Sequence, residues 1–157
     1  MKDSPYFEQA ELMLRAMPHV AAETCFALKG GTAINLFVRD MPRLSVDIDL
    51  AYLPVDEPRE TALKKISEAL GRIAALIKKA IPGAKVQESR AQKPLRVTRL
   101  IVATGQARIK IEPNEVIRGS VFPAEERELS RRAEDLFELS VAARTLSMAD
   151  LYGGKLC

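Results

Sequence analysis

Hydrophobic and polar positions follow two different periods along this chain, which predicts both helices and strands. The clearest helical pattern spans residues 58–80, where apolar side chains recur every three or four positions and charged ones lie off that stripe. The stripe consists of Leu63, Ile66, Leu70, Ile73 and Ile77. An earlier helix is expected over residues 5–17, because Ser4 is a favourable N-cap and proline is favoured at the first helical position.

Short alternating or apolar runs elsewhere predict strands. These runs lie at residues 24–28, 46–50, 85–90, 95–103, 107–112 and 138–141. The Thr104-Gly105-Gln106 stretch between two of them predicts a hairpin turn. Further helices are expected at residues 32–38, at 123–133 and from residue 148 onward. Helices and strands alternate early and strands cluster late, which predicts an α/β (α+β) fold with a mixed β-sheet flanked by helices.

Composition narrows the class of protein. The chain has 157 residues, of which 47% are hydrophobic and 29% charged, so it should form one globular domain with a sizeable core. No apolar run approaches the ~18–20 residues of a membrane span, and the N-terminus lacks the apolar segment of a secretion signal. We therefore expect a cytoplasmic protein with no membrane partner. The net charge of +3 is compatible with an anionic partner such as a nucleotide or RNA, although such a balance more often serves solubility.

The two cysteines, Cys25 and Cys157, show no recognisable functional spacing. They cannot form a disulfide framework and have no metal-ligand spacing. Cys25 lies in an apolar run and is expected to be an inert core residue.

A Gly-Gly pair is the first feature that indicates chemistry. In Lys29-Gly30-Gly31-Thr32 the glycines follow an expected strand and precede an expected helix. Without side chains they let a phosphate approach the backbone, and the free amides at a helix start attract negative charge. Thr32 adds a hydroxyl donor. By itself, however, a Gly-Gly pair is usually only a turn.

Two aspartates form the second feature. Asp47 and Asp49 are two apart on an expected strand, so both carboxylates project from the same face. They alternate with the apolar Val46, Ile48 and Leu50, and charges in such surroundings are costly unless paired with a partner or a metal. Two carboxylates on one face suit Mg²⁺, which takes further ligands from substrate phosphates. An Asp-x-Asp alone is usually a solvated strand face, but a phosphate cradle followed by a carboxylate pair favours nucleotidyl transfer.

A third carboxylate is expected from a neighbouring strand. In residues 109–112 the side chains of Lys110 and Glu112 share one face and those of Ile109 and Ile111 the other. Glu112 is the candidate third metal ligand or general base, and the alternative is an ordinary exposed strand residue. Lys110 could contact a phosphate, although a solvated lysine is the more usual case.

The order of these motifs resembles a known family. Residues 28–33 and 43–50, then 109–114 with Arg118 and Gly119, and finally 149–156 are similar to the AbiEii/AbiGii toxin family of nucleotidyltransferases. This family lies within the polymerase-beta-like nucleotidyltransferase superfamily. The resemblance implies a nucleotidyltransferase-type fold, binding of a nucleoside triphosphate with Mg²⁺, and transfer of nucleotides to an acceptor such as tRNA. It also implies a cognate antitoxin and a role in abortive phage defence.

The resemblance assigns a role to each candidate residue. The predicted catalytic residues are Asp47, Asp49, Glu112 and Lys155, of which Lys155 matches a helix lysine expected to contact phosphate. The predicted metal ligands are Asp47, Asp49 and Glu112. The predicted nucleotide-binding residues are Lys29, Gly30, Gly31, Thr32, Arg43 and Ser45. Arg43 and Ser45 come from the turn before the aspartates, where a purely structural role is equally compatible with the sequence.

Two features of the sequence keep other interpretations open. The family pattern continues beyond Lys155 into a helical region, so we expect residues 1–157 to be a single nucleotidyltransferase domain and the N-terminal portion of a longer protein. The chain could then be an inactive remnant that binds nucleotide or antitoxin, and an uncovered apolar surface would favour a homodimer. The lysines at 64–65 and 78–79 instead allow an RNA-binding module that uses the basic face of the long helix.

Overall fold

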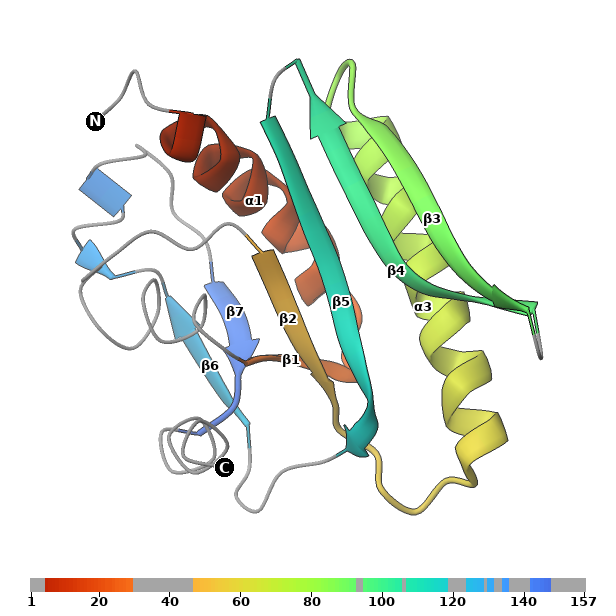
Figure 1. Ribbon diagram of the computed structural model, residues 1–157. Coiled ribbons are helices and arrows are strands. Elements are labelled where there is room, and N and C mark those ends of the chain that lie inside the picture. Colours follow the sequence, from red (N-terminus) through yellow and green to blue (C-terminus); the bar gives the residue numbers. More distant parts are fainter. Residues whose placement is uncertain are drawn as a thin grey trace.

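The sheet predicted from the alternating runs is present, and seven of its strands lie within the described residues. The computed structural model describes residues 5–29, 47–92, 95–105, 107–118, 124–128, 130–131, 134–135 and 142–147. Within them the strand order is β3-β4-β5-β2-β1-β7-β6 (Figure 1). The strands are β1 (Phe26–Lys29), β2 (Asp47–Tyr52), β3 (Lys85–Gln92), β4 (Leu95–Thr104), β5 (Ala107–Arg118), β6 (Glu125–Glu128) and β7 (Ala142–Thr145). The parallel pairs β2–β5 and β1–β7 stand among antiparallel ones, which confirms the predicted mixed sheet.

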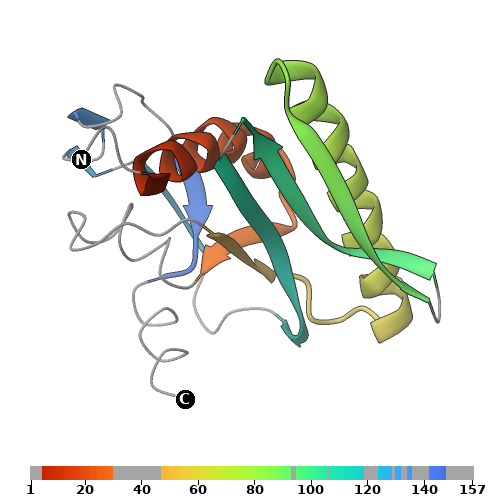
Figure 2. The same ribbon diagram turned by 45° about the horizontal axis from the view of Figure 1, so that its top comes forward.

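Two helices, α1 (Pro5–Ala21) and α3 (Arg59–Ala80), cover one face of this sheet (Figures 1 and 2). Helix α1 packs on β5 and β7, and α3 packs on β4 and β3. All five residues of the predicted stripe of α3 are buried. Neither of these helices is both long enough and apolar enough to span a membrane.

The core lies between the helices and the sheet because each central strand turns its apolar positions toward the helices. On β2, Ile48 and Leu50 are buried, and on β5, Ile109 and Ile111 are buried. The polar positions that alternate with them, at 47 and 49 on β2 and at 110 and 112 on β5, are only half-buried. The sheet therefore presents a polar face on the side opposite the helices, and that face carries the candidate site.

The predicted hairpin between β4 and β5 is confirmed. Thr104 pairs with Ala107 at its end, so a two-residue turn joins the strands. Gly105 has a φ of 52°, in the left-handed region that glycine adopts without strain. The turn sets the register of the two strands, and with it the position of Glu112.

The helix predicted over residues 123–133 is wrong, because residues 125–128 form β6 at the edge of the sheet. Glutamate and arginine favour helices in isolation, but here Glu126 stands opposite Arg144 of β7, and Thr145 Oγ1 donates a 3.3 Å hydrogen bond to the Glu125 carbonyl. Pairing with β7 thus overrides local propensity. The predictions of a strand at 138–141 and of helices at 32–38 and from 148 fall outside the described residues; β7 begins at Ala142.

Candidate active site

The structure brings three predicted site residues onto the polar face of the sheet. Asp47 and Asp49 project from β2 on the side away from the helices, since burial of Ile48 and Leu50 turns the alternate positions outward. Strand β5 runs parallel to β2 and pairs Glu112 with Asp49 and Lys110 with Asp47. The neighbouring strand expected to supply the third carboxylate is therefore present and correctly placed.

Lys29 stands on the other side of the same aspartate. Strand β1 is antiparallel to β2 and places Lys29 opposite Asp49. A cleft of about 360 Å³ lies at this position, lined by Lys29, Asp49, Leu50, Glu112, Pro113 and Asn114. Asp49 thus lies between a lysine on β1 and a glutamate on β5, at an opening large enough to admit part of a small ligand.

Glu112 is held by two cations from neighbouring positions. Lys110 Nζ lies 3.5 Å from one carboxylate oxygen and Arg99 Nη1 lies 3.9 Å from the other. All three side chains are about one-third exposed or more, so each ion pair contributes little stability by itself. Their effect is positional, because they keep the Glu112 carboxylate between β4 and β2.

Burial raises the pKa of Asp49 above its ordinary value of 3.8, and the neighbouring Asp47 carboxylate adds to that shift. Glu112 acts in the same direction, whereas Lys110 and Lys29 oppose it. The charged form of Asp49 is therefore disfavoured in the protein without a bound cation. A cation close to both aspartates would relieve this cost.

The aspartate pair fits the metal that the family implies, and Glu112 remains separate from it. Mg²⁺ is commonly bound by one or two carboxylates together with substrate phosphates, and Asp47 and Asp49 offer that donor set from one face. Within the described ranges, no three acidic, histidine or cysteine side chains gather closely enough to hold a metal ion. The role of Glu112 as a third ligand therefore stays a prediction.

Comparison with known proteins identifies the family. Residues 11–157 match the family model described as nucleotidyl transferase AbiEii toxin of type IV toxin–antitoxin systems. The chain belongs to this AbiEii family. Its structure is similar to that of MenT4, a nucleotidyltransferase toxin from Mycobacterium tuberculosis, with a TM-score of 0.62 and 16% sequence identity. The match covers 97% of this chain and 51% of MenT4, so the chain spans about half the length of that toxin. No curated protein sequence matches it.

Membership of the AbiEii family confirms the predicted family and class of enzyme, and the likeness to MenT4 confirms the predicted fold. Several of the predicted site residues lie outside the described residues. These are Gly30, Gly31, Thr32, Arg43, Ser45 and Lys155. Their assigned roles in this AbiEii chain remain predictions.

Arg99 is a site residue that sequence reasoning missed. The bulge in the β3–β4 pairing lies between the pairs Ser89–Arg99 and Arg90–Val97, so alternation along β4 is unbroken from Arg99 to the hairpin. A signal was available in the hairpin. Counting back from the turn, where Thr104 pairs with Ala107, places Arg99 opposite Glu112 on the same face.

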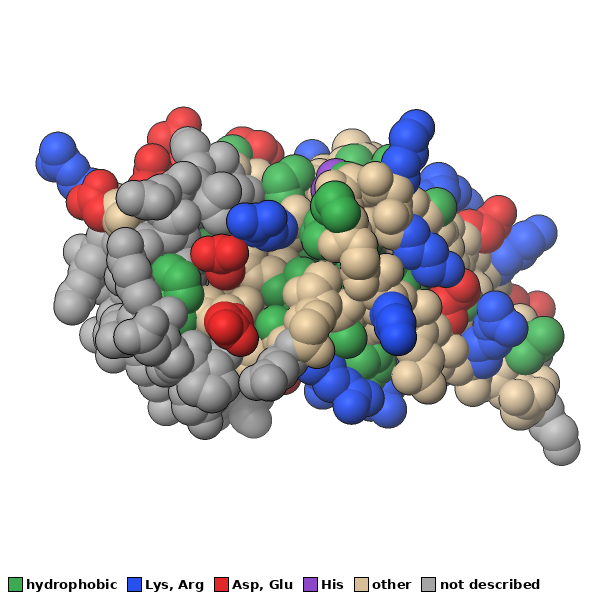
Figure 3. Space-filling view, turned by 90° about the horizontal axis from the view of Figure 1, so that it is seen from above, with side chains coloured by type: hydrophobic (Ala, Val, Ile, Leu, Met, Phe, Trp, Pro, Cys, Tyr) green, Lys and Arg blue, Asp and Glu red, His purple; other side chains and the backbone are tan. Residues whose placement is uncertain are grey.

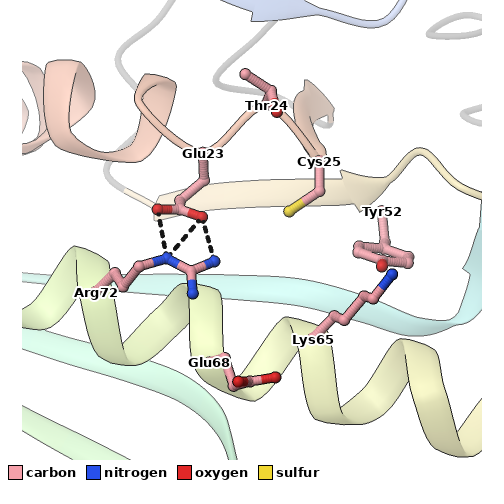
Figure 4. A pocket seen from close by; sticks show the side chains of 7 residues that line it. All are labelled: Glu23, Thr24, Cys25, Tyr52, Lys65, Glu68 and Arg72. Atoms are coloured by element: carbon pink, nitrogen blue, oxygen red, sulfur yellow. Dashed lines mark hydrogen bonds and ion pairs between the residues drawn. The ribbon is translucent and has the colours of Figure 1, made fainter.

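A second pocket lies away from the aspartates and is best explained as structural (Figure 4). It measures about 280 Å³ and lies between the start of β1, the end of β2 and α3. Arg72 donates three hydrogen bonds to the Glu23 carboxylate, at 2.7, 3.0 and 3.2 Å, and both Tyr52 and Lys65 donate to Glu57. These bonds join α3 to the loops at the ends of β1 and β2.

Cys25 faces this second pocket, and its thiol is not activated. Burial, followed by the nearby Glu23 carboxylate, raises the pKa of Cys25 to about 11. The thiol is therefore protonated at neutral pH and is a poor nucleophile. Cys25 is half-buried and packs against the core, which agrees with its predicted inert role.

The raised pKa of Asp49 predicts a pH-dependent gain in stability for Asp49→Asn. The folded state binds the Asp49 proton more tightly than the unfolded state, so the wild-type free energy of unfolding falls as pH rises from below about 3.9 through the raised folded pKa. Asparagine does not titrate. Urea unfolding in EDTA should show that the free energy of unfolding of Asp49→Asn, relative to that of the wild type, rises with pH across that window. Above the window the difference between the two proteins should stay constant. An equal difference at every pH would contradict the raised pKa.

Proposed function

We propose that this chain carries the catalytic centre of a Mg²⁺-dependent nucleotidyltransferase toxin, which transfers nucleotides from a nucleoside triphosphate to an acceptor hydroxyl such as that of tRNA. The observation that carries the proposal is the pair Asp47 and Asp49. They project together from β2, and the raised pKa of Asp49 means that its charge lacks sufficient compensation without a cation. Because the chain belongs to a nucleotidyl transferase family, we assign metal and triphosphate binding to this pair.

The chain's own residues can be assigned complementary tasks. Asp47 and Asp49 would hold Mg²⁺, which when bound orients the triphosphate and offsets its charge. Gly30, Gly31 and Thr32 would cradle the phosphates, and Lys29, opposite Asp49, would contact them from β1.

The bond changes follow from this placement. The acceptor hydroxyl oxygen attacks the α-phosphorus, the bond between the α-phosphorus and the bridging oxygen to the β-phosphate breaks, and pyrophosphate leaves. We assign acceptance of the hydroxyl proton to Glu112, which stands across from Asp49 in the β2–β5 pairing. Arg99 and Lys110 hold its carboxylate in position.

The wider setting of this activity is also part of the proposal. The AbiEii family is described as the toxin of type IV toxin–antitoxin systems. We propose a cognate antitoxin and a cytoplasmic location for this protein. The chain spans about half the length of MenT4, so the acceptor of the transfer is likewise a proposal. The predicted helical C-terminal region stays a prediction, as does the homodimer.

Calorimetric titration of each nucleoside triphosphate tests the proposal. We expect heat of binding for at least one nucleotide with Mg²⁺ present and little without it. Asp47→Ala should abolish the Mg²⁺-dependent part, because it removes one of the two metal-binding carboxylates. The matched control is Asp56→Ala, which removes an exposed aspartate from the loop after β2. Equal Mg²⁺-dependent binding by the wild type and Asp47→Ala would overturn the proposal.

A further inference from the structure

Basic side chains continue outward from the candidate site across the polar face of the sheet. Pairing aligns Lys85 of β3 with Ala103 of β4, and Ala103 with Arg108 of β5, so these residues form one row across three strands. Lys110 lies two residues beyond Arg108 on the same face and is paired with Asp47. We call Lys85, Arg108, Arg99 and Lys110 the basic strip.

The strip has an excess of positive charge. Lys110 and Arg99 both form an ion pair with Glu112, and Lys110 also stands opposite Asp47. Lys85 and Arg108 are exposed, and neither forms an ion pair with another residue in the described part of the chain. The acidic Glu88 of β3 pairs with Leu100, whose buried side chain faces the helices, so Glu88 belongs to the other face. Figure 3, which views the molecule from above, shows basic side chains, with acidic ones among them, on the half that holds β3, β4, β5 and α3.

The spacing of the strip suits a chain of phosphates. Adjacent strands lie about 4.8 Å apart, and alternate residues on one strand lie about 6.7 Å apart. Lys85, Arg108 and Lys110 therefore present cations at successive intervals of about 7–10 Å along a path that ends beside Asp47. A path of cations leading to a carboxylate pair can hold a polyanion whose terminus reaches the metal site.

We infer that the basic strip binds the phosphate backbone of the RNA acceptor and delivers its terminal hydroxyl to Asp47 and Asp49. The inference rests on the proposed function, because a transferase of this class needs an acceptor at the same site. Ile101 and Ala103 of β4 lie among these cations on the same face, and both are half-buried. The regular spacing of the cations favours a polynucleotide, whose affinity comes mainly from contacts with successive phosphates. Binding should depend strongly on salt and little on base identity.

Fluorescence anisotropy with a fluorescein-labelled single-stranded oligoribonucleotide of mixed sequence tests the inference. We compare the wild type with Lys85→Gln/Arg108→Gln on the strip. The matched control is Lys64→Gln/Lys78→Gln, which removes the same charge from exposed positions of α3, on the helix side. The strip variant should bind RNA about tenfold more weakly than the wild type. The slope of log affinity against log salt concentration should become less steep by about 0.7 for each phosphate that the variant no longer neutralises. The control should stay close to the wild type.

The outcomes separate this inference from the proposed function. RNA binding is measured without nucleotide or Mg²⁺, so it does not depend on the aspartates, and Asp47→Ala should retain it. Equal RNA affinity and salt dependence in the strip and control variants would overturn the inference. A protein would then be the better candidate partner for this face of the sheet. A greater reduction in the α3 variant would instead place RNA on the helix and overturn it as well. Failure of the wild type to bind nucleotide with Mg²⁺ would overturn the proposed function and the delivery of the hydroxyl to the aspartates, whereas RNA binding by the basic strip would be judged by the anisotropy result alone.

Discussion

Asp47→Asn should reduce the transfer of labelled nucleotide by more than about 100-fold while the protein stays folded. Loss of a residue that only supports a metal ligand costs about 10–100-fold, so loss of a ligand itself should cost at least as much. Asparagine keeps the shape of the side chain and removes its charge. The half-buried position of Asp47 on β2 accommodates either side chain, and the burial of Ile48 and Leu50 is unchanged.

The measurement is incorporation of radiolabel from the nucleoside triphosphate that calorimetry identifies, into RNA supplied as acceptor. Asp56→Asn makes the same chemical change at an exposed position and should keep wild-type activity. Circular dichroism of both variants checks the fold. Unchanged incorporation in Asp47→Asn would show that this carboxylate does not hold the metal.

Leu70→Ala should lower the free energy of unfolding by about 3 kcal/mol. Leu70 is fully buried in the middle of α3, within the layer between this helix and the sheet. Truncation removes apolar surface from the core and leaves a cavity that the rigid sheet cannot fill. The decrease would be a large part of the stability of a domain of this size.

The same helix supplies the control. Leu76→Ala makes an identical change at a position that is 38% exposed, and its cost should stay within about 0.5 kcal/mol. Urea unfolding followed by circular dichroism measures both variants. Similar decreases at positions 70 and 76 would mean that α3 does not pack against the sheet through the stripe seen here. Because Leu70 belongs to the helix side of the sheet, Mg²⁺-dependent nucleotide binding should persist where the variant is folded.

Much of the fold follows from local patterns that the sequence displays. The 3.6-residue period of α3 and the two-residue period of β2 and β5 each come from consecutive residues, so their buried positions are predictable. The hairpin at Gly105 is equally local. The same reasoning fails at β6, where a glutamate-rich segment takes its conformation from pairing with β7.

In the candidate site, too, some features follow from the local sequence and others depend on how the strands pair. Alternation on β2 predicts that Asp47 and Asp49 share a face, and the burial pattern of the strand agrees with this prediction. The partnership of Arg99 with Glu112 crosses from β4 to β5, so it depends on the pairing of two strands and cannot be read from alternation within one strand.

The sequence by itself therefore determined the family motifs, the spacing of the aspartates and which side of each central strand is apolar. Only the tertiary structure decided that β5 lies parallel to β2 with Glu112 beside Asp49, that Lys29 stands opposite, and that the basic strip leads to the same place. The physical reason is the distance along the sequence over which each feature is encoded. Periodicity is encoded within a few neighbouring residues, whereas the pairing of strands some sixty residues apart depends on the simultaneous burial and hydrogen bonding of the whole sheet.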